Sequence, residues 1–360
     1  MAERKARDIR ELDGNFAALP VEDGLRWIDV RLLGLEGCGW TEVEHPFDRL
    51  PAKAKGVVRD RVWELGHHSA GLCVRFVTDA THLAARWTLR ADQVAWPHMT
   101  STGISGLDLY ARLDGRWRWL AAGLTIGQRE SRATFSPEIV PGEREMMLYL
   151  PLYNSVEALA IGVPPEARVS PGPEWPEDRR RPICFYGTSI VQGGCASRPG
   201  MVHTAILGRR LDRPVINLGM SGNGQMEQEM ADLLAELDPC VYVLDAVPNM
   251  DLAMASTRVE PFVRTLRKTR PATPIVLMES IVYQDAPFRP DHRKNWVEKN
   301  AVLRATYQRL AAGGVAGLCY VPSEDLLGDD GEATIDGVHL TDLGFMRMSD
   351  RLEPVLRRLV

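Results

Sequence analysis

Short apolar stretches separated by turn residues fill the first half of the chain, from Val21 to about Val169. Residues 107–113 (LDLYARL) alternate between apolar and polar side chains, as a half-buried strand does. The Asp114-Gly115 pair that follows predicts a hairpin turn into residues 116–119. Similar runs occupy residues 72–76, 81–89, 146–152 and 156–163. No convincing amphipathic helix lies between them, so we expect an all-β sandwich of the jelly-roll type.

A proline-rich segment follows these predicted strands. Its prolines are Pro164, Pro165, Pro171, Pro173, Pro176 and Pro182. Closely spaced prolines keep a chain stiff and extended. We therefore predict a linker with a boundary near Trp175, which divides the chain into domains of residues 1–175 and 176–360.

The second half has a different period. Continuous apolar runs at residues 183–186, 215–218, 241–244, 275–278 and 317–321 have the pattern of buried parallel strands. Between and after them lie predicted helices at residues 199–211, 225–237, 256–269, 295–312 and 342–359. This alternation predicts a doubly wound, flavodoxin-like α/β fold with a mostly parallel, five-stranded sheet. In such sheets, the functional site lies at the carboxyl ends of the strands.

Small and polar residues stand at these predicted strand ends. Ser189 follows the first strand, Gly222 the second and Asn249 the third, and Asp336 and His339 lie just before the last helix. Acyl transfer needs such a set, because a serine hydroxyl is a weak nucleophile until a histidine takes its proton. A carboxylate holds that histidine in the correct tautomer, and N–H donors stabilise the oxyanion.

Each residue of this set also has an ordinary structural interpretation. Ser189 and Asn249 are typical of turns, Asp336 could simply begin a turn with Gly337, and His339 could be a surface histidine near a helix start. Their order and their placement at successive strand ends favour the catalytic interpretation.

The second half also resembles the SGNH subgroup of the GDSL-type esterases, a family named for Ser, Gly, Asn and His in four blocks. Here the blocks read GTSI, NLGMSGNGQ, VPNMD and DGVHLTDLGF. The resemblance implies that Ser189 is the nucleophile, His339 the base and Asp336 the residue that orients it. It also implies an oxyanion hole made by the backbone N–H groups of Ser189 and Gly222 and the side chain of Asn249.

Two positions depart from the family pattern. Thr188 stands where the family usually has Asp, and Val-Pro precedes Asn249 in place of the commoner Gly-x. The usual Asp is not the acid of the triad, so we expect activity to survive its replacement. A β-sandwich before an SGNH domain is similar to two subgroups: bacterial GDSL-like enzymes that include natural-product acyltransferases, and a carbohydrate esterase family that is typically secreted.

Composition and charge narrow the choice of partners. The chain has 360 residues, is 45% apolar and 25% charged, and carries a net charge of -5. This gives no electrostatic reason to expect nucleic acid or an anionic membrane as partner. No apolar run is long enough to span a bilayer and the N-terminus lacks a signal peptide pattern, so we expect a cytoplasmic protein. None of the six cysteines forms a Cys-x-x-Cys pair, and we expect neither a metal nor another cofactor.

Two further groups of side chains are candidates for substrate binding. Tyr283, Phe288, His292 and Trp296 lie in a predicted loop of residues 282–296, and we single out Tyr283 and Trp296 as substrate contacts. The first half contains Trp63, Trp87, Trp96, Trp117 and Trp119, which could stack on sugars or belong to the core and its hairpins. His67 and His68 are adjacent, which disfavours joint metal ligation on a strand.

We therefore expect a metal-free serine esterase that acts on a small acyl ester of a saccharide or another small molecule. One alternative is an acyltransferase with the same triad, and another is an inactive carbohydrate-binding protein. The sequence does not identify the ester or the oligomeric state.

Overall fold

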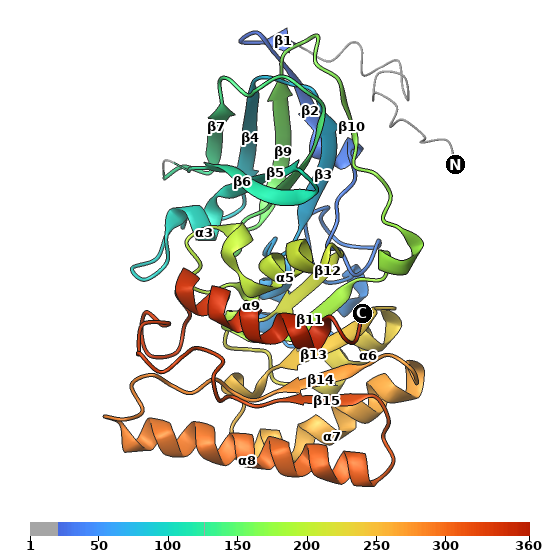
Figure 1. The fold of residues 1–360 in the computed structure, drawn as a ribbon, viewed down its shortest axis with the longest axis vertical. Helices are drawn as coiled ribbons and strands as arrows, with labels where there is room; N and C mark the ends of the chain where they lie inside the picture. Colours follow the sequence, from blue (N-terminus) through green and yellow to red (C-terminus); the bar gives the residue numbers. More distant parts are fainter. Residues whose placement is uncertain (1–20, 126) are drawn as a thin grey trace.

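The computed structural model describes residues 21–125 and 127–360. Its first half forms two antiparallel sheets of five strands each (Figure 1). The first sheet has the order β1 (Val21–Glu22), β2 (Leu25–Asp29), β9 (Val156–Val163), β4 (Leu83–Leu89) and β7 (Glu130–Ser136). The second has the order β10 (Val169–Pro171), β3 (Cys73–Thr78), β8 (Arg144–Tyr149), β5 (Leu107–Leu113) and β6 (Arg116–Gly123).

The two antiparallel sheets share a hydrophobic core. Ile28 and Ile161 of the first sheet lie in the same buried cluster as Leu107 and Leu109 of the second. The predicted alternation of β5 is therefore present, although its other face is buried as well. Sequence patterns missed β2, β7 and β10. The jelly-roll topology stays a prediction.

Two short helices lie where we expected none, which corrects the all-β expectation. They are α2 (Asp60–Gly66) and α3 (Ser101–Ser105), and both are too short for a helical period to show in the sequence. The side chain of Thr100 accepts a hydrogen bond from Gly103 N and so caps α3.

The proline-rich segment is not a free linker, because part of it packs against the antiparallel sheets. Its residues Val169–Pro171 form β10, which pairs with β3. Further along, the guanidinium of Arg75 lies 3.9 Å from the ring centre of Trp175, a cation–π contact. The segment is thus packed against the second antiparallel sheet.

The second half contains the expected parallel sheet. Its strand order is β12 (Val215–Gly219), β11 (Ile183–Gly187), β13 (Val241–Asp245), β14 (Ile275–Met278) and β15 (Leu318–Val321). The register places Gly187 opposite both Gly219 and Asp245. The carboxyl ends of β12, β11 and β13 therefore lie side by side, and the strand order is that of a flavodoxin-like sheet.

Helices cover both faces of the parallel sheet, as its continuous apolar strands require. One face packs against α5 (His203–Leu211) and α9 (Asp342–Leu356). The other packs against α6 (Gln228–Glu236), α7 (Leu252–Thr269) and α8 (Pro290–Ala312) (Figure 1).

Helix starts were the least accurate of the sequence predictions. The predicted helix 199–211 is interrupted at Val202, so that a 3₁₀ turn, η5 (Pro199–Met201), precedes α5. α7 begins at Leu252 because the Asp251 side chain caps it. α8 begins at Pro290, a residue well suited to a first helical position. The predicted loop 282–296 is therefore helical over its last residues, including Trp296.

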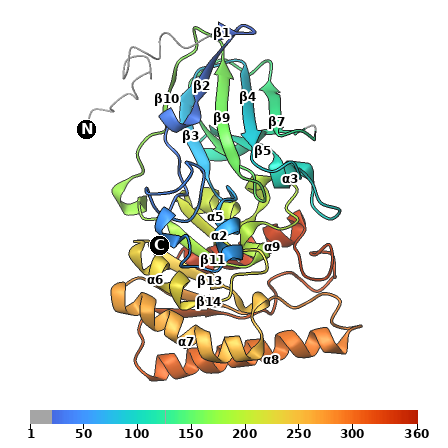
Figure 2. The same ribbon diagram turned by 180° about the vertical axis from the view of Figure 1, so that it is seen from behind.

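The two halves of the chain share buried cores. Tyr110, Met147 and Tyr149 of the second antiparallel sheet belong to the cluster that includes α5 and α9. Leu50 and Leu65, from the segment that carries α2, pack instead into the cluster on the α6 side of the parallel sheet. Figure 2 shows α2 at the level of the parallel sheet, below the antiparallel ones.

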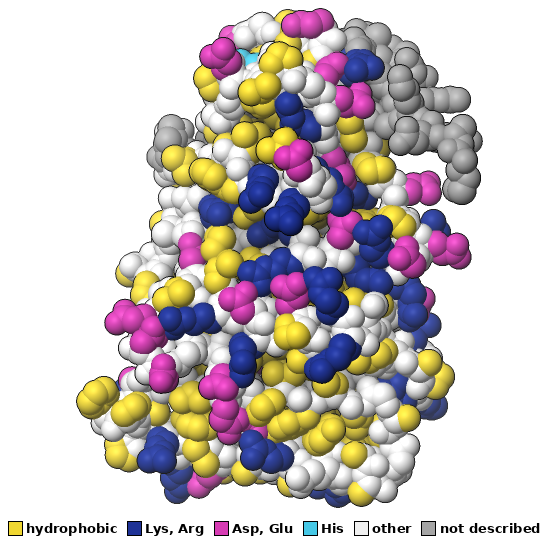
Figure 3. All heavy atoms as spheres, in the orientation of Figure 1, with side chains coloured by type: hydrophobic (Ala, Val, Ile, Leu, Met, Phe, Trp, Pro, Cys, Tyr) yellow, Lys and Arg dark blue, Asp and Glu magenta, His cyan; other side chains and the backbone are white. Residues whose placement is uncertain are grey.

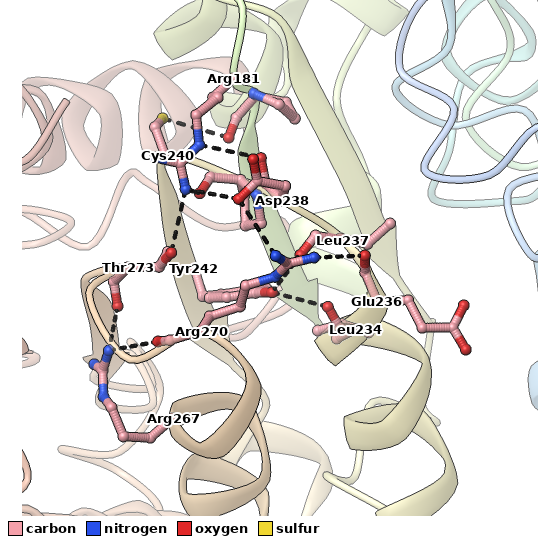
Figure 4. A network of polar contacts seen from close by, with 12 residues as sticks. Arg181, Leu234, Glu236, Leu237, Asp238, Cys240, Tyr242, Arg267, Arg270 and Thr273 are labelled. Atoms are coloured by element: carbon pink, nitrogen blue, oxygen red, sulfur yellow. Dashed lines mark hydrogen bonds and ion pairs between the residues drawn. The ribbon is translucent and has the colours of Figure 1, made fainter.

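The amino ends of the parallel strands are tied together by a polar network (Figure 4). The Arg181 guanidinium, just before β11, donates to Asp238 Oδ1 at 2.9 Å and to Thr273 Oγ1 at 3.3 Å. Arg267 and Arg270 donate to carbonyl oxygens in the same region. This network stabilises the edge of the sheet opposite the carboxyl ends.

Charges of both signs are interspersed on the face shown in Figure 3, with Lys and Arg more frequent at the level of α5 and α9. Two arginines at α5 have acidic partners: Arg112 lies 3.0 Å from Asp212, the residue after α5, and Arg210 of α5 lies 2.7 Å from Asp350. Within residues 21–125 and 127–360, each helix is too short or too polar to cross a membrane.

Candidate functional site

Ser189 occupies a sharp turn at the end of β11, which lies between β12 and β13 in the sheet. The strand ends at Gly187, and Ser189 begins the short helix α4 (Ser189–Gln192). Gly193 then adopts a φ of 109°, a left-handed conformation that glycine tolerates and other residues rarely adopt. The backbone N–H groups of Gly193 and Gly194 both donate to the carbonyl oxygen of Ser189. The two glycines thus turn the chain away directly after Ser189.

His339 and Asp336 meet Ser189 at this turn. Ser189 Oγ lies 2.9 Å from His339 Nε2, and His339 Nδ1 lies 2.7 Å from Asp336 Oδ2. Asp336 Oδ1 also accepts hydrogen bonds from the backbone N–H groups of Val338 and His339. The three predicted residues therefore form a continuous hydrogen-bonded chain.

The charge on Asp336 determines which ring nitrogen of His339 carries the proton. Burial acts to raise the pKa of Asp336, but the hydrogen bonds from the His339 backbone and ring and from Val338 outweigh it, so the pKa lies below its usual value. An ionised carboxylate only accepts hydrogen bonds, so Nδ1 of His339 carries the proton. Nε2 is then free to accept the hydroxyl proton of Ser189, as a general base must.

The predicted oxyanion donors stand at the neighbouring strand ends. Gly222 comes three residues after Gly219, which is paired with Gly187, and its φ is 68°. Asn249 ends a 3₁₀ turn, η6 (Val247–Asn249), just after β13. The same parallel register therefore brings Ser189, Gly222 and Asn249 to one edge of the sheet.

Gln192 and Tyr153 connect these strand ends, and neither role could be predicted from the sequence. The buried Gln192 accepts from Ser221 N at 3.0 Å and donates to Leu152 O at 3.0 Å. Tyr153 OH donates to Ser189 O at 3.2 Å and lies 3.4 Å from Ser221 Oγ. The turn that carries Gly222 is thereby linked to the turn that carries Ser189.

A fully buried arginine from the first half supports the same turn. Arg49 Nη1 donates to the carbonyl oxygens of Asn217 and Gly219, and its other nitrogens donate to Leu65 and His68 carbonyls. Burial lowers the pKa of Arg49 to about 10. Four carbonyl acceptors compensate for part of the cost of burying its charge.

Asp108 of β5 holds the loop that follows α4. Its carboxylate, which is 0% exposed, accepts from Arg198 Nη1 at 2.7 Å, Gly200 N at 2.8 Å and Trp119 Nε1 at 2.9 Å. Tyr110 OH accepts a further bond from Arg198 at 2.6 Å. In the sequence, Asp108 alternates with core leucines, a pattern typical of a solvent-exposed face, so its burial could not be predicted.

The same loop reaches the helix after His339. Ser197 N donates to Asp342 Oδ1 at 2.9 Å, and Ser197 Oγ donates to Asp342 Oδ2 at 2.5 Å. Asp342 is the first residue of α9. The loop 195–201 therefore joins β5 to the segment that carries His339.

Two rings of the first half lie beside the candidate triad. The His98 ring centre is 6.2 Å from that of His339, and the Trp96 ring centre is 5.5 Å from that of Tyr153. Of the five tryptophans noted in the sequence, Trp96 is thus brought next to the site, whereas Trp87 is a core residue that is only 2% exposed.

The predicted substrate contacts on residues 282–296 are placed differently from what we expected. Tyr283 is buried and Trp296 packs against the hydrophobic core, while His292 pairs with Asp285 and Phe288 is exposed. Tyr283 still lies near the His339 loop, since its neighbour Gln284 donates to Gly337 O at 2.9 Å. A pocket beside Asn249 is lined instead by other residues of this region, among them Asp291, Lys294 and Asn295. A binding role for Tyr283 or Trp296 stays a prediction.

Within the part of the chain that the structure describes, one group of side chains has the composition of a metal site. His45, Asp48 and His67 offer ligand atoms that all lie within 4.8 Å of one another. In the structure, His67 Nδ1 lies 3.0 Å from Asp48 Oδ2.

Asp245 is a second unusual group at the carboxyl edge of the sheet. It is 1% exposed, and neither of its side-chain oxygens has a hydrogen-bond partner among the described residues. Burial raises its pKa to about 7. A buried carboxyl without partners favours the neutral form.

Comparisons with known proteins agree with this architecture. The GDSL-like Lipase/Acylhydrolase family matches residues 180–357, and the family described as the N-terminus of SGNH-hydrolase-type esterases matches residues 25–169. No curated protein matches the chain.

Several solved structures are similar over nearly the whole chain. The salicylyl-acyltransferase SsfX3 from a tetracycline biosynthetic pathway is 16% identical, with a TM-score of 0.75 over 94% of this chain and 99% of that one. The acetyl xylan esterase Est2A from the rumen bacterium Butyrivibrio proteoclasticus is 11% identical, with a TM-score of 0.57 over 93% and 98%. At these identities, the likeness concerns the fold alone.

A GDSL-like protein from Bacteroides ovatus ATCC 8483 is more similar in sequence. It is 33% identical, with a TM-score of 0.88 over 93% of this chain and 98% of that chain. With this identity over almost the full length of both chains, and with both family matches, the chain belongs to the GDSL-like lipase/acylhydrolase family of SGNH-type esterases.

Proposed function

We propose that the protein is a serine esterase that hydrolyses a short acyl ester, such as an acetyl ester, of a carbohydrate or natural product. The observation that carries the proposal is the hydrogen-bonded chain from Ser189 Oγ through the His339 ring to Asp336. Such a chain lets a serine act as nucleophile near neutral pH.

In the first half of the reaction, Ser189 Oγ attacks the ester carbonyl carbon while its proton moves to His339 Nε2. The oxyanion that forms would be held by the backbone N–H groups of Ser189 and Gly222 and by the Asn249 side chain. Collapse of this intermediate breaks the bond to the alcohol oxygen. His339 returns its proton to that oxygen, and the acyl group remains on Ser189.

In the second half, a water molecule attacks the acyl-serine and gives its proton to His339. Collapse then releases the carboxylic acid, and the proton returns to Ser189 Oγ. Asp336 stays ionised throughout and stabilises the imidazolium that forms twice.

The first test is Ser189→Ala with p-nitrophenyl acetate as substrate, together with labelling of the wild type by a fluorophosphonate. We expect the variant to lose turnover by at least about 10³-fold, and the label to attach to Ser189. Wild-type turnover in the variant would show that the nucleophile is another residue. Failure of labelling would favour an inactive carbohydrate-binding protein instead.

An acyltransferase is the second candidate, because the same fold occurs in the salicylyl-acyltransferase SsfX3. It would differ only in the group that attacks the acyl-serine, an alcohol in place of water. Product analysis at increasing concentrations of an added alcohol separates the two: a hydrolase yields mainly free acid, whereas a transferase yields mainly the new ester.

A further inference from the structure

The turn 96–99 of the first half approaches the candidate triad from the antiparallel sheets. Trp96 and Met99 exchange two backbone hydrogen bonds, Trp96 N to Met99 O at 3.2 Å and Met99 N to Trp96 O at 3.0 Å. The turn lies directly before Thr100, the residue that caps α3. In Figures 1 and 2, α3 lies between the antiparallel sheets and the first residues of α9. The turn is thus a small, closed structure and not a loose loop.

Hydrogen bonds fix this turn to the loop after Ser189. Thr100 Oγ1 donates to Ser197 O at 2.8 Å, and Ser197 is bonded to Asp342 at the start of α9. The Trp96 ring meets the Tyr153 ring at 66°, an edge-to-face arrangement, and Tyr153 OH donates to Ser189 O. Tyr153 therefore contacts the turn, Ser197 contacts the adjacent Thr100, and each also contacts a segment that carries part of the triad.

His98 is exposed, as is its neighbour Pro97, and its ring lies beside that of His339. The alcohol oxygen of an ester must come within hydrogen-bond distance of His339 Nε2 to receive the proton. The ring centres of His98 and His339 are 6.2 Å apart, so nitrogens of both rings can lie about 2.9 Å from groups bound between them. An alcohol group that receives its proton from His339 Nε2 can therefore also contact His98.

We propose that the turn 96–99 forms the subsite for the alcohol portion of the ester, and that this alcohol is an uncharged ring bearing several hydroxyl groups. This proposal rests on the esterase function proposed above. The His98 imidazole both donates and accepts hydrogen bonds, as a hydroxyl partner must, and the half-buried Trp96 presents an aromatic surface to the C–H face of a sugar-like ring.

The charge of the segment supports an uncharged alcohol. Residues 91–100 (ADQVAWPHMT) contain one aspartate and neither lysine nor arginine. Anionic groups such as phosphate are usually bound by Arg or Lys, and the segment supplies neither.

The experiment compares two acetyl esters that differ in the alcohol, methyl 6-O-acetyl-glucopyranoside and ethyl acetate. The quantity measured is the ratio of their kcat/KM values in the wild type, His98→Ala, Trp96→Ala and Trp96→Phe. The matched control is His82→Ala, which replaces a histidine located between β3 and β4. Fluorophosphonate labelling of Ser189 in each variant reports whether the triad is still assembled.

We expect His98→Ala and Trp96→Ala to lower the ratio of sugar acetate to ethyl acetate by about tenfold, because the contacts they remove form only with the ring alcohol. Trp96→Phe should retain part of the ratio, and His82→Ala should retain all of it. A ratio within twofold of wild type in labelled His98→Ala and Trp96→Ala would overturn the subsite. If the wild type hydrolyses neither ester and Ser189 is not labelled, the esterase function and the subsite fall together.

Discussion

Ser189 Oγ and His339 Nε2 lie 2.9 Å apart although 150 residues separate them in the chain. The contact depends on two turns, one directly after β11 and the other before α9. Both are anchored by the loop 195–201, which is itself held by Asp108 of the antiparallel half. The candidate triad lies in the second half of the chain, and its position is supported by contacts with the first half.

The contact between Ser189 and His339 predicts non-additive kinetics. Each of Ser189→Ala and His339→Ala should lower kcat for p-nitrophenyl acetate by at least about 10³-fold, because neither residue transfers the proton without the other. The double variant should be no slower than the worse single variant by more than a few-fold. Multiplicative losses, measured under the same conditions, would mean that the two residues act independently.

The oxyanion assignment predicts a large loss of kcat when Asn249 is replaced by alanine and a small one when Gly222 is. Asn249→Ala should lower kcat by roughly 10² to 10³-fold with little change in KM, since its donor acts on the transition state. Gly222→Ala keeps the backbone N–H, and a Cβ there meets no atom within 4 Å, so it should cost mainly the strain of its positive φ. Asn295→Ala, which changes the same pocket without removing the proposed donor, is the control. Equal losses in Asn249→Ala and Asn295→Ala would contradict the assignment.

The raised pKa of Asp245 predicts that the free energy of unfolding falls as the pH rises from about 4 to about 7. Its pKa is raised by burial to about 7 from 3.8, so the folded state holds the proton more tightly than the unfolded chain. The contribution of Asp245 to the free energy of unfolding is therefore fully present below about pH 4. It is lost as pH rises towards about 7, by up to roughly 4 kcal/mol.

Asp245→Asn should remove this dependence. Relative to wild type, the variant should gain stability between pH 4 and pH 8, by an amount on the order of 2 to 4 kcal/mol. Urea unfolding at the two pH values measures it, and Asp350→Asn, at an exposed ion pair, is the control. A difference between Asp245→Asn and wild type that is the same at both pH values would show that Asp245 titrates normally.

The close packing around Gly200 predicts that a side chain at this position would disturb the contact between the two halves of the chain. A Cβ at Gly200 would lie 2.5 Å from Tyr110 Cε2 and 2.6 Å from Asp108 Oδ2. Gly200→Ala should therefore lower the free energy of unfolding by roughly 1 to 3 kcal/mol. It should also slow the labelling of Ser189, because the displaced loop carries the link to α9.

The matched control for Gly200→Ala is Gly313→Ala at the exposed end of α8, where φ is -78°. We expect its effect on stability to be less than about 1 kcal/mol. Unfolding in urea and the rate of fluorophosphonate labelling check both variants. Similar results for the two would mean that the contact between Asp108 and Gly200 does not position the site.

The amino-acid sequence by itself determined the parallel sheet and the identity of the candidate triad. Strands such as Ile275–Met278 are continuous apolar runs, and their period is a local property that can be read without knowing the fold. Because parallel strands end at a common edge, the residues after each strand were expected to converge, and Ser189 and His339 do meet there.

Tertiary structure alone decided which distant residues support and border that edge. Arg49, Asp108 and Gln192 occupy buried positions whose hydrogen-bond partners are remote in sequence, and His98 reaches His339 from the other half of the chain. Polar residues of this kind carry no periodic signal, and they can be buried only where the folded backbone supplies their partners. The pattern of the chain therefore identifies the candidate reacting groups, whereas the packing of its two halves determines what surrounds them.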